Sequence, residues 1–182
     1  MKTVEMNTST LEILQVKDFD KVYSIMEESF PIDERRTYEE QKALLDNELY
    51  NIYVLYDNEN DNIKAFIAIW SFDDFAFVEH FAVSPLYRNG GIGALILQEV
   101  KKLLSSMICL EVELPEEEMA KRRIGFYERN GFYYNEYEYM QPSISKGRNE
   151  IPLRIMTTGG KVIEDRFIEI KRILYKNVYS VE

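Results

Sequence analysis

The 182-residue chain is poor in the residues that form disulfides, metal centres and membrane spans. It has one cysteine, Cys109, and one histidine, His80, so an internal disulfide is excluded and a zinc site of Cys and His ligands is not expected. No stretch approaches the roughly 18 consecutive apolar residues of a membrane helix, and the first residues lack the apolar segment of a secretion signal. We therefore expect a cytoplasmic protein with no metal and no membrane partner.

Positive charge is also scarce. Lys and Arg total 22 against 32 Asp and Glu, which gives a net charge of −10. Because nucleic-acid binding needs positive side chains that displace counterions from phosphates, no nucleic-acid partner is expected. An acidic chain favours solubility, and it is also compatible with a cationic ligand. The 46% of apolar residues suffices for the core of one ordinary domain.

Hydrophobic periodicity predicts both helices and strands. Helices are expected where apolar residues recur three and four apart, and Thr37 with Glu40 forms a capping box for one of them. Their order predicts an α+β or three-layer α/β domain, with helices flanking a mixed central sheet of about seven strands. The expected strands are 11–16, 51–57, 63–72, 75–84, 107–114, 132–140 and 151–158. The expected helices are 18–30, 37–47, 91–106, 115–130 and 161–178.

The stretch LYRNGGIGALIL, residues 86–97, places three glycines in four positions between a strand and an apolar helix. Glycines there let the backbone approach a phosphate, and a helix N-terminus offers N–H groups to an anion. A P-loop needs Lys-Ser/Thr after its last glycine, whereas Ala-Leu follows Gly93. A dinucleotide fingerprint needs another glycine three residues later, where this chain has isoleucine. The pattern that fits is Arg/Gln-x-x-Gly-x-Gly/Ala, formed by Arg88, Gly91 and Gly93.

This pattern resembles the acetyl-CoA pyrophosphate loop of the GNAT superfamily of N-acetyltransferases. The strand before the loop ends in FAVSP (81–85), a common family form, and FYERNGF (126–132) resembles the family's Phe-Tyr-x-x-x-Gly-Phe signature. The resemblance covers residues 11 to about 158. It implies a single N-acetyltransferase domain over residues 1–182, with an extra C-terminal helix at about 161–178.

The resemblance implies acetyl-CoA as co-substrate and the primary amine of a small molecule or peptide as acceptor. It also implies a bulge that splays strand 75–84 from the next strand, so that the exposed backbone pairs with the pantetheine arm and polarises the thioester carbonyl. The asparagine that family members often carry seven residues before the signature tyrosine is Ala120 here. The residues implied in cofactor binding are Phe81, Ala82, Val83, Arg88, Asn89, Gly90, Gly91, Ile92, Gly93 and Ala94.

Two side chains are implied in catalysis. Glu79 occupies a position where many family members carry a group that draws off the amine proton, often through water. The alternatives are that Glu79 pairs with an arginine or only attracts the ammonium. His80 is the rival base, and simple strand alternation places it on the opposite face from Glu79. Tyr127 matches the tyrosine that protonates the coenzyme A sulfur, with core packing as the alternative for one of 13 tyrosines.

The acceptor site is expected where acidic and aromatic residues gather in the loop 31–36 and the strands near the C-terminus. These residues favour a cationic amine. The competing function is an acetyl-CoA-binding sensor without turnover, which would need neither Glu79 nor Tyr127. The acidic and aromatic residues are Asp33, Glu34, Glu136, Tyr137, Glu138 and Tyr139.

The C-terminal helix is expected to present one apolar stripe. Such a stripe is stable only when it is buried, either on its own domain or on a second copy of the chain. A monomer and a homodimer both satisfy this requirement. The short tether favours packing on its own domain. The stripe consists of Ile163, Phe167, Ile170 and Leu174.

Overall fold

The computed structural model describes residues 11–181. One mixed sheet runs through its centre in the order β1-β2-β3-β4-β5-β8-β6, and β7 also pairs with β8. Strands β4 and β5 are parallel, and the other described pairs are antiparallel. The strands are β1 Glu12–Ile13, β2 Tyr50–Tyr56, β3 Ile63–Ser71, β4 Phe75–Val83, β5 Met107–Glu113, β6 Phe132–Tyr134, β7 Tyr139–Gln141 and β8 Ile151–Thr158. The helices are α1 Phe19–Ser29, α2 Tyr38–Ala43, α3 Ile92–Leu103, α4 Glu118–Arg129 and α5 Glu164–Asn177.

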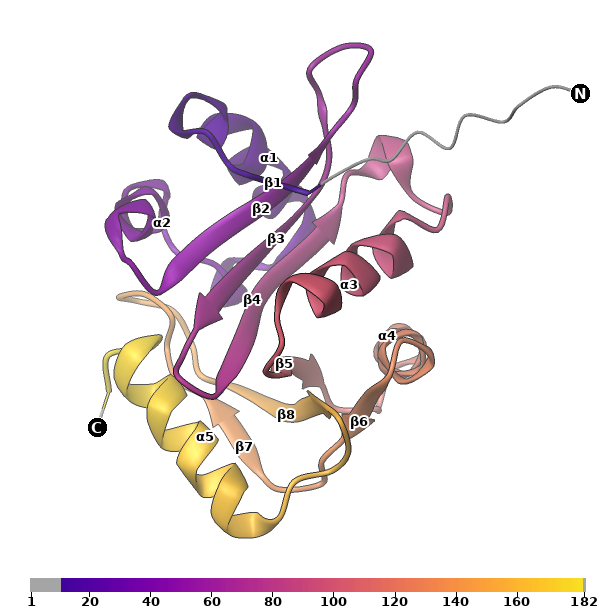
Figure 1. The fold of residues 1–182 in the computed structure, drawn as a ribbon. Helices are drawn as coiled ribbons and strands as arrows, with labels where there is room; N and C mark the ends of the chain where they lie inside the picture. The colour runs from indigo at the N-terminus through magenta and orange to yellow at the C-terminus, as the bar shows by residue number, and fades with distance from the viewer. Residues whose placement is uncertain (1–10, 182) are drawn as a thin grey trace, which may run out of the picture.

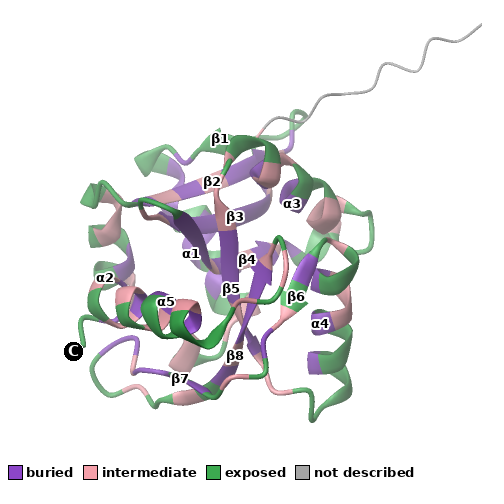
Figure 2. Ribbon diagram, turned by 60° about the horizontal axis from the view of Figure 1, so that its bottom comes forward, coloured by how far each residue is buried: buried purple, intermediate pink, exposed green. Residues whose placement is uncertain are grey.

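Helices cover both faces of the sheet and divide the core into two layers (Figure 1). Helices α1, α2 and α5 lie on one face, and α3 and α4 lie on the other. Figure 2 shows that the buried residues concentrate in the central strands, while the outer helix faces are exposed. This arrangement confirms the predicted three-layer architecture with a C-terminal helix. None of the described helices has both the length and the apolarity needed to cross a bilayer.

The helices follow the sequence pattern closely. In α1, Phe19, Val22 and Met26 are fully buried at spacings of three and four residues. The capping box of α2 is confirmed, because the Glu40 N–H donates to the Thr37 hydroxyl and the Glu40 carboxylate accepts from the Thr37 N–H. The loop between α1 and α2, residues 30–37, contacts β4, where Arg36 pairs with Glu79.

Several predicted boundaries were wrong. The strand expected at 11–16 is reduced to β1, and residues 44–46 form a 3-10 turn in place of the end of a longer helix. The strand expected at 132–140 is split into β6 and β7, because Asn135 between them donates its side-chain N–H groups to Ile155 O and the Thr157 hydroxyl.

The C-terminal helix also begins later than expected. Helix α5 starts at Glu164, because Gly159 and Gly160 adopt φ values of +80° and +130° and turn the chain first. Ile163 therefore stays 71% exposed and does not belong to the buried stripe. The rest of the stripe packs on its own sheet, where Phe167, Ile170 and Leu174 join the same core layer as α1.

Strand β4 contains a bulge that shapes the rest of the molecule. Ala68 of β3 pairs with His80, and its neighbour Ile69 pairs with Val78, so Glu79 is an extra residue in β4. The pairing of β4 with β5 covers Phe75 to Val78 and then stops. Beyond that point the two parallel strands part. The backbone of residues 79–83 therefore has no described strand partner on the β5 side, as the family resemblance implies.

The packing of α5 yields a matched pair of stability tests. Ile170 is fully buried and Ile168 is 55% exposed on the same helix. Ile170→Ala is expected to lower the free energy of unfolding by about 2–5 kcal/mol, because it removes buried methyl groups and leaves a cavity. Ile168→Ala should change it by about 0.5 kcal/mol or less. Urea denaturation of both variants measures the difference, and equal losses would show that α5 is not packed on the sheet in solution.

Candidate active site

The splayed strands β4 and β5 line a cavity of about 530 Å³. One wall is Val78–Val83 of β4, and the other is Leu110–Glu113 of β5. The loop before α3 closes one end, and α4 adds Phe126 and Tyr127. Of the catalytic and cofactor-binding residues predicted from the sequence, the cavity brings together all except Gly90.

The glycine loop has the conformation that its sequence requires. Gly91 is the residue before α3 and adopts a φ of +77°, a backbone conformation that residues with a β-carbon rarely adopt. A β-carbon placed there would meet no atom within 4 Å, so open space lies at the helix N-terminus. At Gly93 a β-carbon would lie 3.1 Å from Phe126 Cζ and 3.7 Å from Phe81 Cζ. Gly93 therefore lets α3 pack against α4 and β4.

Glu79 is a buried carboxylate with a buried partner. Its Oε1 lies 2.7 Å from Arg36 Nη1, and the two side chains are 2% and 6% exposed. Burial by itself raises the pKa of Glu79, but the charges and hydrogen bonds of Arg36 and His80 outweigh it and lower that pKa to about 2. Glu79 therefore carries a negative charge at neutral pH. Its pairing with Arg36 agrees with one of the alternatives from the sequence, in which Glu79 pairs with an arginine.

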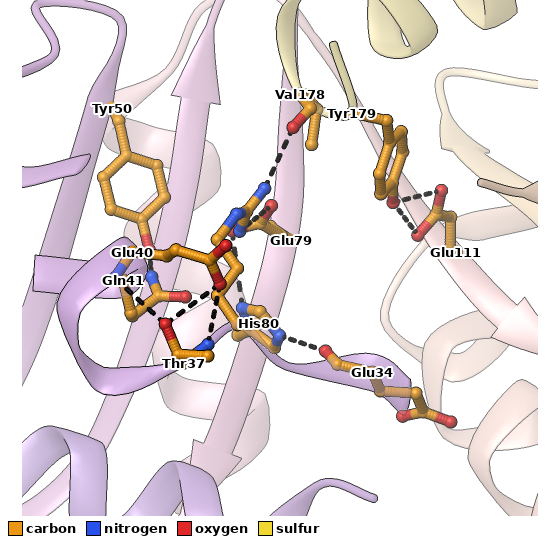
Figure 3. A network of polar contacts seen from close by, with 11 residues as sticks. Glu34, Thr37, Glu40, Gln41, Tyr50, Glu79, His80, Glu111, Val178 and Tyr179 are labelled. Carbon is orange, nitrogen blue, oxygen red and sulfur yellow. Dashed lines mark hydrogen bonds and ion pairs between the residues drawn. The ribbon is translucent and has the colours of Figure 1, made fainter. Parts of the chain in front are cut away.

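His80 lies on the same face of the sheet as Glu79, so the expectation from simple alternation is wrong. The bulge at Glu79 shifts the phase of the strand by one residue. Both side chains consequently face the loop between α1 and α2, where His80 Nε2 donates to the Glu34 carbonyl oxygen at 2.7 Å (Figure 3). His80 Nδ1 lies 3.4 Å from Glu79 Oε2.

Glu111, on the opposite wall of the cavity, was missed in the sequence. Its Oε1 accepts hydrogen bonds from the Tyr139 and Tyr179 hydroxyls at 2.5 and 2.8 Å, and its Oε2 accepts from Tyr179 at 2.7 Å. Desolvation of this partly buried carboxyl group raises its pKa, the hydrogen bonds from the two tyrosines lower it, and the charge of Glu79 raises it, with a net pKa of about 7. A carboxyl group that titrates near neutral pH inside a cavity is suited to proton transfer.

Tyr127 lines the cavity from α4 and is 9% exposed. Its ring packs between Phe126 and Phe132, with centroid separations of 5.3 and 5.6 Å. Burial raises its pKa to about 12, so the hydroxyl keeps its proton at any physiological pH. The structure is compatible with both roles considered for Tyr127, proton donation and core packing, because its ring is packed against its neighbours and the residue borders the cavity.

Four carboxylates line the cavity. Besides Glu79 and Glu111, these are Glu34 and Glu113, and Arg123 Nη1 lies 3.0 Å from Glu113 Oε2. Burial, followed by the charge of Glu113, raises the pKa of Glu34.

Of the acidic and aromatic residues expected in the acceptor site, Glu34 is the one that lines this cavity. The others have different neighbours. Asp33 accepts hydrogen bonds from Asn149, the Tyr137 hydroxyl donates to the Val162 carbonyl, and Tyr139 holds Glu111. Glu136 and Glu138 are exposed. Within residues 11–181, no three His, Cys, Asp or Glu side chains are arranged to hold a metal ion.

Comparison with known proteins gives the family. Residues 48–134 match the description Acetyltransferase (GNAT) domain. A solved structure of a Bacteroides thetaiotaomicron protein assigned to the GNAT acetyltransferases is 36% identical, matches 94% of this chain and 99% of its own, and has a TM-score of 0.84. The comparison with curated proteins gives no match. The chain therefore belongs to the GNAT family of acetyltransferases.

More distant structures share the fold. The ribosomal-protein-S18-alanine N-acetyltransferase of Escherichia coli is 23% identical over 82% of this chain and 92% of its own, with a TM-score of 0.60. An aminoglycoside 6'-N-acetyltransferase complexed with coenzyme A is 15% identical over 81% of this chain and 95% of its own, with a TM-score of 0.61. The family membership confirms the assignment made from the three motifs and, with it, the enzyme class, an acyltransferase.

The raised pKa of Glu111 predicts a pH-dependent loss of stability. Its folded pKa of about 7 lies above the ordinary value of 4.5, so the folded state binds the extra proton between these pH values. Stability should therefore fall as pH rises from 5 to 8, by roughly 3 kcal/mol at about 1.4 kcal/mol per pH unit. Glu111→Gln should lack this component. Denaturation curves of both proteins at pH 5 and pH 8 measure it, and parallel pH dependence would contradict the assigned shift.

Proposed function

We propose that this protein transfers the acetyl group of acetyl-CoA directly to the primary amine of a cationic small molecule or peptide. The observation that carries the proposal is the convergence of three features on one cavity. These are the edge of β4 that β5 leaves unpaired, the glycine turn before α3, and the side chains of Glu111 and Tyr127 as candidate proton-transfer groups.

Two features of the cavity support coenzyme A binding at the positions that the family resemblance implies. The open space beside Gly91 lies at the N-terminus of a 12-residue helix, where backbone N–H groups and the helix dipole favour a diphosphate. The edge formed by Phe81, Ala82 and Val83 offers backbone groups to the amides of the pantetheine arm. A backbone N–H from this edge would also stabilise the oxyanion at the thioester carbonyl, an effect worth about 3 kcal/mol in other enzymes.

The acceptor amine must lose a proton before it reacts, because an ammonium has no lone pair. At pH 7 only about 0.04% of a lysine-like amine is neutral. Glu111, with a pKa of about 7, is poised to accept this proton, whereas Glu79, with a pKa of about 2, is a weak base. We therefore assign proton acceptance to Glu111 and the attraction of the ammonium to Glu79. Proton acceptance by Glu79, as predicted from the sequence, is the alternative.

The transfer forms a C–N bond to the acetyl carbon and breaks its bond to sulfur. The departing thiolate then needs a proton, for which Tyr127 is the proposed donor. Its raised pKa keeps it protonated in the resting enzyme. Four carboxylates, Glu34, Glu79, Glu111 and Glu113, line the cavity. Although arginines pair with Glu79 and Glu113, we expect this acidic lining to favour an amine that carries positive charge.

Coenzyme A binding at the glycine turn can be tested with a matched pair of variants. Gly91 and Gly147 have φ values of +77° and +81°, and at both positions an added β-carbon meets nothing within 4 Å. Asparagine tolerates this conformation best among residues with side chains, so both Asn variants should be similarly stable. Gly91→Asn fills the phosphate space and should weaken coenzyme A binding at least tenfold by calorimetry, whereas Gly147→Asn should not. Equal affinities would refute the site.

Turnover is tested by the release of free thiol from acetyl-CoA across a panel of polyamines, aminoglycosides and lysine peptides. Thiol release that depends on a cationic amine, together with acetylated product by mass spectrometry, is the expected result. Tyr127→Phe should lower kcat about 100-fold with little change in coenzyme A affinity. Acetyl-CoA binding without turnover on any amine would instead support the acetyl-CoA sensor.

A further inference from the structure

The segment that follows α5 reaches the surroundings of two carboxylates of the cavity, Glu111 and Glu79. The Tyr179 hydroxyl donates to Oε1 and Oε2 of Glu111 at 2.8 and 2.7 Å. One residue earlier, the Val178 carbonyl accepts from Arg36 Nη2 at 3.0 Å, and Nη1 of the same guanidinium pairs with Glu79 (Figure 3). This segment lies outside residues 48–134, which match the acetyltransferase domain.

The contact is built into the fold. Val178 and Tyr179 are 5% and 6% exposed, and their N–H groups donate to the Leu174 carbonyl in the last turn of α5. Leu174 is itself fully buried in the core layer beneath α5. The position of the Tyr179 hydroxyl is thus fixed by the packing of the whole C-terminal helix.

We propose that Tyr179 is a positioning residue of the active site, which orients the Glu111 carboxylate in the cavity and favours its charged form. The proposal rests on the proposed function, in which Glu111 accepts the amine proton. Tyr179 is the one described residue that donates to Glu111 Oε2, whereas Oε1 also has Tyr139. Without the Tyr179 hydroxyl, Oε2 would lose its described donor and the carboxylate could rotate about its terminal bond.

The other groups around Glu111 do not replace this interaction. Hydrogen bonds to a carboxylate stabilise its charged form, and a nearby negative charge opposes that form. Loss of the Tyr179 hydroxyl should therefore raise the pKa of Glu111. The groups that face it from the packed elements are Tyr139 on β7, Tyr175 on α5, Glu79 and His80 on β4, and Tyr179 itself, with Arg36 behind Glu79 and Tyr179.

The direct test is an NMR titration of protein labelled with 13C at the glutamate carboxyl carbon. The Glu111 signal is identified by its loss in Glu111→Gln. Tyr179→Phe should raise the Glu111 midpoint by roughly one pH unit, since each strong hydrogen bond to a carboxylate has an effect of about that size. Tyr175→Phe is the matched control, because its hydroxyl lies on the same C-terminal element and donates to the Met140 carbonyl. The titration midpoint of Glu111 in Tyr175→Phe should equal that in the wild type.

The kinetic counterpart is the acidic limb of kcat/KM, with thermal unfolding as a control for folding. In Tyr179→Phe the limb should move upward with the NMR midpoint, and activity should return to within about twofold of the wild type near pH 9. An unmoved midpoint, or a lower melting temperature with an unmoved limb, would reduce Tyr179 to a packing residue and overturn the inference.

The same profiles separate this inference from the proposed function. Glu111→Gln should remove the limb near pH 7, whereas Glu79→Gln should keep it. If Glu111→Gln keeps the wild-type limb, Glu111 is not the proton acceptor, and both assignments fail. If Glu111→Gln removes the limb but Tyr179→Phe leaves it in place, only the role of Tyr179 fails.

Discussion

Beyond Val78, strand β4 keeps its hydrogen bonds to β3 on one edge and loses β5 on the other. Unpaired backbone in a protein interior is costly unless water, side chains or a ligand satisfies it. The bulge at Glu79 brings about this separation and also turns Glu79 and His80 toward the same face. The cavity, its acidic wall and the approach to the glycine turn all follow from one extra residue in a central strand.

Glu79 and Glu111 show how the neighbours of a carboxyl group set its charge. Glu79 faces an arginine, and its pKa falls to about 2 although its side chain is only 2% exposed. Glu111 faces neutral tyrosine hydroxyls, which offset burial only in part, and its pKa stays at about 7. Two glutamates on opposite walls therefore differ at neutral pH: Glu79 stays charged, whereas Glu111 can gain and lose a proton. The C-terminal segment contacts both, so the docking of α5 and the chemistry of the cavity are coupled through Val178 and Tyr179.

Much of this arrangement could be predicted from the sequence because it depends on local signals. The capping box at Thr37, the glycine turn at Gly91 and the periodicity of α1 each have a short-range physical cause. The position of His80 could not be predicted by alternation, since a bulge leaves no unique trace in a strand of nine mostly apolar residues. Glu111 was missed for a similar reason: in a strand it resembles any polar residue between apolar neighbours.

The tyrosines that hold Glu111 are distant in the sequence. Tyr139 and Tyr179 lie 28 and 68 residues away, and only the folded sheet brings them to one carboxylate.

The acidic residues of the sequence did not identify the acceptor site clearly either. The acidic cluster at Glu136 and Glu138 is exposed, whereas Glu34 reaches the cavity because the loop between α1 and α2 packs against β4. Charge composition therefore did not identify which acidic residues line the cavity.

Binding of the acetyl-CoA arm along the unpaired edge of β4 is tested most directly by amide hydrogen exchange with and without coenzyme A. Coenzyme A should slow exchange in residues 79–94, which include the β4 edge and the glycine turn, while exchange in β2 stays unchanged. Unaltered exchange across residues 79–94 at saturating coenzyme A would contradict it.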